Sequence, residues 1–219
     1  MSEIVLFHSA LGLRPAVHGF ADELRIAGHM VHTPDLFDGD VFEDLAEGIR
    51  KRDALGIPEL MRRANKAVAD LPGGISYAGF SMGAGAAEYL AATRAGAKSA
   101  ILMQGVVAPE QGGITSWPRG VPVQVHYARD DSSMDLKAVE SLSALVRNSG
   151  AHIGVYAYAS GGHLFADEGT RDYDRAASWL MLERVLELLA RVDLADRITE
   201  DRATTPRRRP RPEGEGFAN

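Results

Sequence analysis

The feature that most constrains the fold of this chain is the alternation of short apolar runs with longer segments of helical periodicity. The runs expected to form strands are residues 3–8, 74–80, 99–106, 121–128 and 152–159, together with the run at 30–37, whose strand is expected to end at Pro34. The segments expected to form helices are residues 16–27, 41–53, 58–71, 82–95, 135–148 and 171–191. Nearly continuous apolar runs are typical of strands buried on both faces, and helical connections favour parallel pairing. The order therefore predicts an α/β fold with a mostly parallel sheet of about six strands and helices on both faces.

Length and composition are those of a globular protein that can bury a core. The chain has 219 residues, of which 45% are hydrophobic and 25% charged, and its net charge of -6 argues against nucleic acid as the main partner. It has no cysteine, which excludes disulfides, thiolate metal ligands and a cysteine nucleophile, and which agrees with a reducing cytosol. We find no basic secretory n-region and no run of about 18 uncharged apolar residues. We therefore expect a cytoplasmic monomer or homodimer that contacts neither membrane nor nucleic acid.

A change in composition near the C-terminus predicts the end of the folded part. From residue 204 onward the chain is rich in Pro, Arg and Gly and has almost no apolar side chains, so it cannot bury enough surface to offset the entropy of ordering. We predict one domain over residues 1–195 and a disordered tail over 196–219. A simple solvated tail is favoured over one that binds an acidic surface or nucleic acid.

Polar residues that directly follow the expected strands are the first site candidates, because ligands of open parallel sheets bind beyond the carboxyl ends of the strands. Ser81 is one of them, within the sequence YAGFSMGAG between an expected strand and an expected helix. The G-x-S-x-G pattern in this context is typical of a nucleophile elbow, in which a serine occupies a tight turn between two glycines. The alternative is a Gly/Ser turn without chemistry, which the flanking strand and helix disfavour.

A serine hydroxyl needs a base, and the base needs an acid to orient it. Of the seven histidines, His163 lies downstream of Ser81 in a glycine-rich loop at the expected edge of the sheet. Asp130 and Asp131 both follow the fifth expected strand. Asp131 is preferred because it lies further into the loop, although strand register alone does not decide between them. The sequence thus predicts a catalytic set of Ser81, Asp131 and His163.

Acyl transfer also needs hydrogen-bond donors for an oxyanion. The backbone N–H groups of Met82 and of Ala10, in the loop after the first strand, are the two candidates. The candidates for substrate binding are Ser9, Arg14 (for an acidic group), Gln104, Trp117 and Phe165. Tyr77 is a further candidate for the wall of the pocket. Each of these side chains is explained equally well by packing or by ordinary exposure. The HxxH pattern at 29–32 has no third ligand, so we predict no metal site.

The order serine, aspartate, histidine resembles that of α/β-hydrolases, and over about residues 3–190 the chain is most similar to the dienelactone hydrolase family. The likeness rests on LFHSALGL, GHMVHTPDLFDG, GFSMGAG, VHYARDD and GGHLFAD. The resemblance implies a compact α/β-hydrolase fold with no large cap domain and with no metal or organic cofactor. It also aligns the family's acid with Asp131.

The chain departs from the family's namesakes at two positions. Those enzymes carry cysteine where this chain has Ser81, and a first-loop glutamate where it has Ser9. The resemblance therefore implies a serine hydrolase that cleaves a small ester, lactone or thioester through an acyl-enzyme on Ser81. The alternatives are an acyltransferase or peptidase with the same three residues, or a non-catalytic ligand-binding protein on the same fold.

Overall fold

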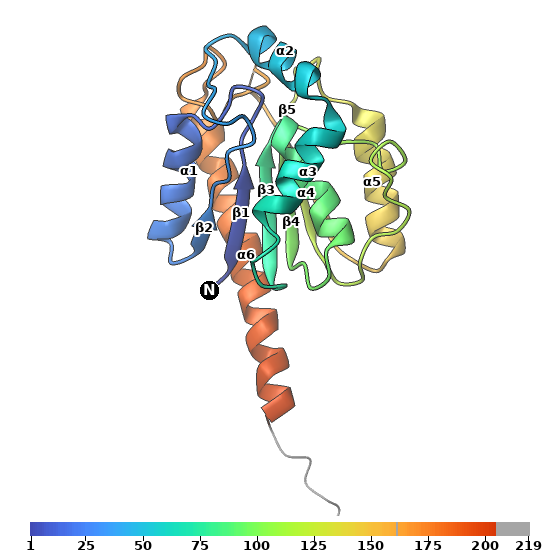
Figure 1. The fold of residues 1–219 in the computed structure, drawn as a ribbon. Helices are drawn as coiled ribbons and strands as arrows, with labels where there is room; N and C mark the ends of the chain where they lie inside the picture. The colour runs from blue at the N-terminus through green and yellow to red at the C-terminus, as the bar shows by residue number, and fades with distance from the viewer. Residues whose placement is uncertain (161, 205–219) are drawn as a thin grey trace, which may run out of the picture.

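A computed structural model describes residues 1–160 and 162–204, and they form a single six-stranded sheet flanked by helices (Figure 1). In spatial order the strands are β2 (Met30–His32), β1 (Glu3–Phe7), β3 (Ile75–Phe80), β4 (Ser99–Met103), β5 (Val123–Ala128) and β6 (Ile153–Tyr158). Every neighbouring pair is parallel. The predicted α/β class, the parallel sheet and the strand count are therefore confirmed.

The helices cover both faces of this sheet and enclose two apolar cores. They are α1 (Pro15–Ile26), α2 (Leu45–Leu55), α3 (Ile57–Ala67), α4 (Met82–Thr93), α5 (Leu136–Asn148) and α6 (Arg175–Thr204). One core packs residues of α3, α4 and α5 against the sheet, and the other packs residues of α1 and α6 against its opposite face. Burial on both faces explains why β3, in the middle of the sheet, is buried at every position.

Two strands end earlier than the sequence predicts. β2 stops at His32 rather than at Pro34, and Leu36 and Phe37 are buried in the loop that follows. β4 stops at Met103 rather than at residue 106, because the next residue, Gln104, has a φ of 62° and leaves the strand conformation. The run SAILMQGV had extended the prediction for β4 beyond this turn.

α6 differs most from expectation. It begins at Arg175 rather than at residue 171 and continues to Thr204, past the lower end of the sheet in Figure 1. Residues 196–204 are therefore helical and not disordered. No glycine or proline interrupts residues 192–204, so nothing local stops the helix there.

The rest of the predicted tail, 205–219, lies outside the described residues, and the division at residue 195 stays a prediction. No helix of the described part of the chain has the length and apolar character needed to cross a membrane.

Candidate active site

Ser81 lies on a tight turn between the end of β3 and the start of α4. Its backbone has a φ of 48° and a ψ of -110°, which a residue with a side chain rarely adopts. The glycines on either side are required by close packing. A Cβ atom at Gly79 would overlap the carbonyl of Gly83, and a Cβ at Gly83 would lie 2.6 Å from the carbonyl oxygens of Phe7 and His8 in and after β1. α4 therefore approaches the sheet closely, and the serine is held at the carboxyl end of the central strand.

The structure brings the three predicted catalytic side chains together. The Ser81 hydroxyl donates a hydrogen bond of 2.8 Å to Nε2 of His163. The Nδ1–H group of His163 donates a bond of 2.6 Å to Oδ2 of Asp131. The proton positions are assigned from this chain of contacts, because Nδ1 faces a carboxylate and Nε2 faces a hydroxyl. The arrangement joins a hydroxyl, an imidazole and an acid that follow β3, β6 and β5, respectively.

Asp131 is fixed in place by the loop after β5. Its side chain is 2% exposed, and its second carboxylate oxygen accepts a 2.8 Å bond from the N–H group of Ser133. The neighbouring Asp130 is exposed. A buried carboxylate beside Nδ1 holds the imidazole in one tautomer and one ring orientation, so the surroundings of Asp131 suit the acid's role and those of Asp130 do not.

The loop that carries His163 is tied down on its far side. The N–H group of Leu164 donates to the carboxylate of Asp172 over 3.4 Å, and the N–H group of Asp174 donates to the carbonyl of Phe165 over 2.9 Å. These bonds make the loop fold back on itself before α6 begins. The imidazole therefore reaches Ser81 from an ordered segment.

The two backbone N–H groups predicted to bind an oxyanion make no hydrogen bond within the described residues. Met82 is the first residue of α4, where helix N–H groups have no partner within the helix. Ala10 lies in the loop after β1. Neither N–H group has a hydrogen-bond partner among the described residues.

His8 orients one of these groups, a role that the sequence analysis missed. This histidine is fully buried; its Nε2 accepts a 2.9 Å bond from the N–H of Leu36, so its Nδ1–H donates to the carbonyl of Ser9 at 2.6 Å. Gly12 N–H donates to the same carbonyl at 3.1 Å. That carbonyl and the Ala10 N–H belong to one planar peptide unit, so fixing the carbonyl fixes the donor. Burial lowers the pKa of His8, which keeps the ring neutral. The available signal was a histidine directly after a strand.

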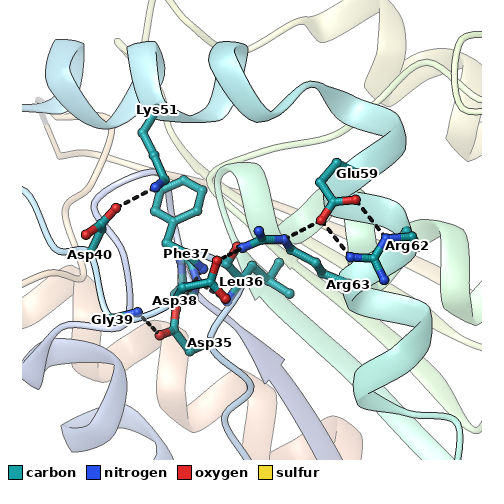
Figure 2. A network of polar contacts seen from close by, with 11 residues as sticks. Asp35, Leu36, Phe37, Asp38, Gly39, Asp40, Lys51, Glu59, Arg62 and Arg63 are labelled. Carbon is teal, nitrogen blue, oxygen red and sulfur yellow. Dashed lines mark hydrogen bonds and ion pairs between the residues drawn. The ribbon is translucent and has the colours of Figure 1, made fainter.

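The loop that holds Leu36 is itself anchored to α3, as Figure 2 shows. The Arg63 guanidinium donates to the carbonyl of Leu36 over 2.8 Å and pairs with Glu59 over the same distance. Within the loop, the Asp35 carboxylate accepts bonds from the N–H groups of Phe37 and Gly39. The hydrogen bond from Leu36 to His8 is therefore supported both by α3, through Arg63, and by the bonds of Asp35 within the loop.

Two of the predicted pocket residues lie near Ser81, and one does not. Ser9 and Gln104 line a small cavity beside the elbow. Arg14 was expected to meet an acidic substrate group, but its guanidinium donates to the carbonyls of Phe42 and Gly169 over 3.1 and 3.3 Å and is 8% exposed. Because these contacts join three loops, Arg14 has a structural position.

The aromatic pocket candidates are corrected as well. The Trp117 indole donates to the carbonyl of Val121 over 2.8 Å and packs in the core beneath α5. Phe165 is fully buried in the opposite core, with its ring 5.0 Å from that of Tyr158. Tyr77 is fully buried in β3, and its hydroxyl contacts Arg94. Large apolar side chains near strand ends stabilise the cores here.

Glu88 is a buried acid that the sequence analysis did not single out. It lies on α4 with no exposed surface, and one carboxylate oxygen accepts a 3.0 Å bond from the N–H group of Val107, in the loop after β4. The other oxygen has no partner among the described residues. Burial raises the pKa of Glu88 to about 8, so the side chain is largely protonated at neutral pH.

Comparisons with known proteins agree with this architecture. The model of the dienelactone hydrolase family matches residues 1–193. A dienelactone hydrolase-like promiscuous phosphotriesterase from metagenomic libraries is 21% identical with a TM-score of 0.70, over 88% of this chain and 87% of that one. A dienelactone hydrolase from Anabaena variabilis is 20% identical with a TM-score of 0.60, over 87% and 86%. Esterase PE8 is 18% identical with a TM-score of 0.60, over 87% and 92%.

At these identities the solved structures show a shared fold. No curated protein matches the chain.

Proposed function

The chain belongs to the dienelactone hydrolase family, whose members are hydrolases acting on ester bonds, and from that premise we propose that it cleaves a small ester, lactone or thioester through an acyl-enzyme on Ser81. The observation that carries the proposal is the continuous set of hydrogen bonds from Ser81 through His163 to Asp131. A serine becomes a nucleophile at neutral pH when a base accepts its proton and an acid orients that base.

In the first half of the reaction, Ser81 Oγ attacks the carbonyl carbon of the substrate while its proton passes to Nε2 of His163. The carbonyl electron pair moves onto oxygen, and Asp131 stabilises the imidazolium that forms. The tetrahedral intermediate then collapses. The bond to the leaving oxygen or sulfur breaks, and His163 gives its proton to that leaving group.

In the second half, water replaces the leaving group. His163 Nε2 accepts a proton from the water as its oxygen attacks the acyl carbon. Collapse of the second intermediate breaks the bond to Ser81 Oγ, which regains its proton from His163. The products are the free acid and the unmodified serine.

The developing oxyanion needs donors that already point at it, each worth about 3 kcal/mol in the transition state. The free N–H groups of Met82 and Ala10 are the donors in this proposal. The contact of His8 with the Ser9 carbonyl supports the second one, because it holds the Ser9–Ala10 peptide before substrate arrives.

Kinetics with 4-nitrophenyl acetate test the proposal. Wild type should release nitrophenol in a burst followed by steady turnover, because acylation precedes a separate hydrolytic step. Ser81→Ala should show neither phase. Ser141→Ala, the same change at an exposed position on α5, is the matched control and should behave as wild type. Equal rates for wild type and Ser81→Ala would rule out the serine mechanism. A non-catalytic binding protein would give no burst at all.

A further inference from the structure

The side chain of Gln104 is buried without any hydrogen bond. It is 1% exposed, and neither its Nε2 nor its Oε1 atom has a partner among the described residues. A buried amide without a partner loses its hydrogen bonds to water and gains none in return, so such a group calls for a physical explanation. Gln104 follows β4 directly, and its φ of 62° is unusual for a residue other than glycine.

The backbone around Gln104 is locked against the neighbouring strands. Its N–H group donates to the carbonyl of His126 over 2.6 Å, and the N–H group of Ser81 donates to the carbonyl of Met103 over 2.7 Å. A Cβ atom at Gly105 would lie 2.6 Å from the carbonyl oxygen of Ser81. Because residues on both sides of Gln104 pack against the elbow, the direction of its side chain is fixed.

Gln104 faces a cavity that adjoins the reacting groups. Ser9, which follows β1, and Gln104, which follows β4, line the same cavity as Phe80, the last residue of β3. Since β3 lies between β1 and β4, the cavity lies at the carboxyl end of β3. Phe80 directly precedes Ser81, and a further wall residue, Leu164, directly follows His163. The cavity has room for about one water-sized group.

The charge of the cavity limits what can enter it. Asp167 is 9% exposed and also lines the cavity; its carboxylate accepts a 2.9 Å bond from the N–H group of Gly169 and lies 3.8 Å from Nε of Arg14. A substrate carboxylate in the cavity would lie close to this acid and to the side-chain carbonyl oxygen of Gln104, and this proximity disfavours binding of an anion. A hydroxyl is neutral, donates one hydrogen bond and accepts others, and so complements an amide that offers both N–H and C=O groups.

We propose that this cavity binds a hydroxyl group carried on the carbon next to the ester carbonyl, and that the enzyme therefore prefers esters of small 2-hydroxy acids. The position follows from two of the cavity walls, Phe80 and Leu164, which are the chain neighbours of Ser81 and His163. The inference rests on the proposed function of Ser81 and adds the substrate class. Gln104 is the specificity-determining residue, because it supplies both a donor and an acceptor.

Ethyl glycolate and ethyl acetate, hydrolysed in a pH-stat, give the test. They differ by one hydroxyl on the carbon next to the carbonyl. The measured quantity is the ratio of the two kcat/KM values, for wild type and for Gln104→Leu, which keeps a similar volume and removes both hydrogen-bonding groups. Comparing the ratios cancels the greater intrinsic reactivity of the glycolate ester. Gln104→Leu should lower the ratio of the two kcat/KM values by about tenfold or more.

Gln111→Leu, the same change at an exposed position, is the matched control and should keep the wild-type ratio. A ratio that Gln104→Leu leaves unchanged overturns the inference, because a permanently bound water would then explain the buried amide. An equal loss on both esters also overturns it, since that is the sign of a structural role. If neither ester is hydrolysed and a fluorophosphonate does not label Ser81, the proposed function itself fails. Labelling of Ser81 without a hydroxyl preference defeats the specificity inference alone.

Discussion

Asp131 and Asp130 are adjacent acids whose surroundings assign them different roles. Asp131 is enclosed and bonded to His163, whereas Asp130 faces solvent. Asp131→Asn should lower kcat on 4-nitrophenyl acetate by about 10³- to 10⁴-fold, because the amide favours the wrong imidazole tautomer. Asp130→Asn should stay within about twofold of wild type, by the usual neutrality of exposed sites. A larger loss in Asp130→Asn than in Asp131→Asn would reverse the assignment.

Glu88 gives a pH dependence whose sign follows from its environment. Burial raises its pKa to about 8 in the folded protein, from an ordinary value of 4.5. Between those pH values the folded state binds more protons than the unfolded state, so the free energy of unfolding falls as pH rises. Glu88→Gln stays neutral and avoids this loss. Thermal melts should show the variant near wild type at pH 5 and several degrees more stable at pH 8. A constant difference in Tm across this range would contradict the raised pKa.

At the scale of secondary-structure elements, two glycines in different helices make a matched pair. Gly83 in α4 has no room for a Cβ, whereas a Cβ at Gly19 in α1 meets nothing within 4 Å. Gly83→Ala should lower Tm strongly, because α4 must move away from β1. Gly19→Ala should raise the free energy of unfolding by about 0.5–1 kcal/mol through better helix propensity. Thermal melts of both variants check this, and similar Tm values for the two would contradict the packing argument.

The elements also show where sequence reasoning succeeds and fails. All six strands and six helices were predicted, because each is an apolar or periodic run bounded by turn residues. The end of β4 was not, since the backbone turns at Gln104, within the run predicted as strand, and β2 ends slightly before the predicted Pro34. The positions of Ser81, Asp131 and His163 follow from strand ends in a parallel sheet. The hydrogen bonds of His8 and the burial of Trp117 depend on how distant loops pack, which no local pattern encodes.

At the scale of the whole molecule, the end of α6 contributes little to the folded body. Among the side chains of α6 that the structure describes, Val192 is the last buried apolar one, while Leu194 and Ile198 are 52% and 45% exposed. The contact between Lys98 and Asp196 is a partly exposed ion pair, a class worth about 0–1 kcal/mol. A chain that ends at Ala195 should therefore keep its kcat/KM and lose only a few degrees of Tm. Loss of cooperative melting in the shortened chain would show that the domain extends beyond residue 195.

The central claim is that the folded chain makes the hydroxyl of Ser81 reactive enough to form a covalent bond. Peptide mass spectrometry after reaction with a fluorophosphonate measures this most directly. The account predicts the added mass on the peptide containing Ser81 and none on that peptide after His163→Gln, in which the base is missing. Modification at another residue, or undiminished modification of Ser81 without His163, would contradict it.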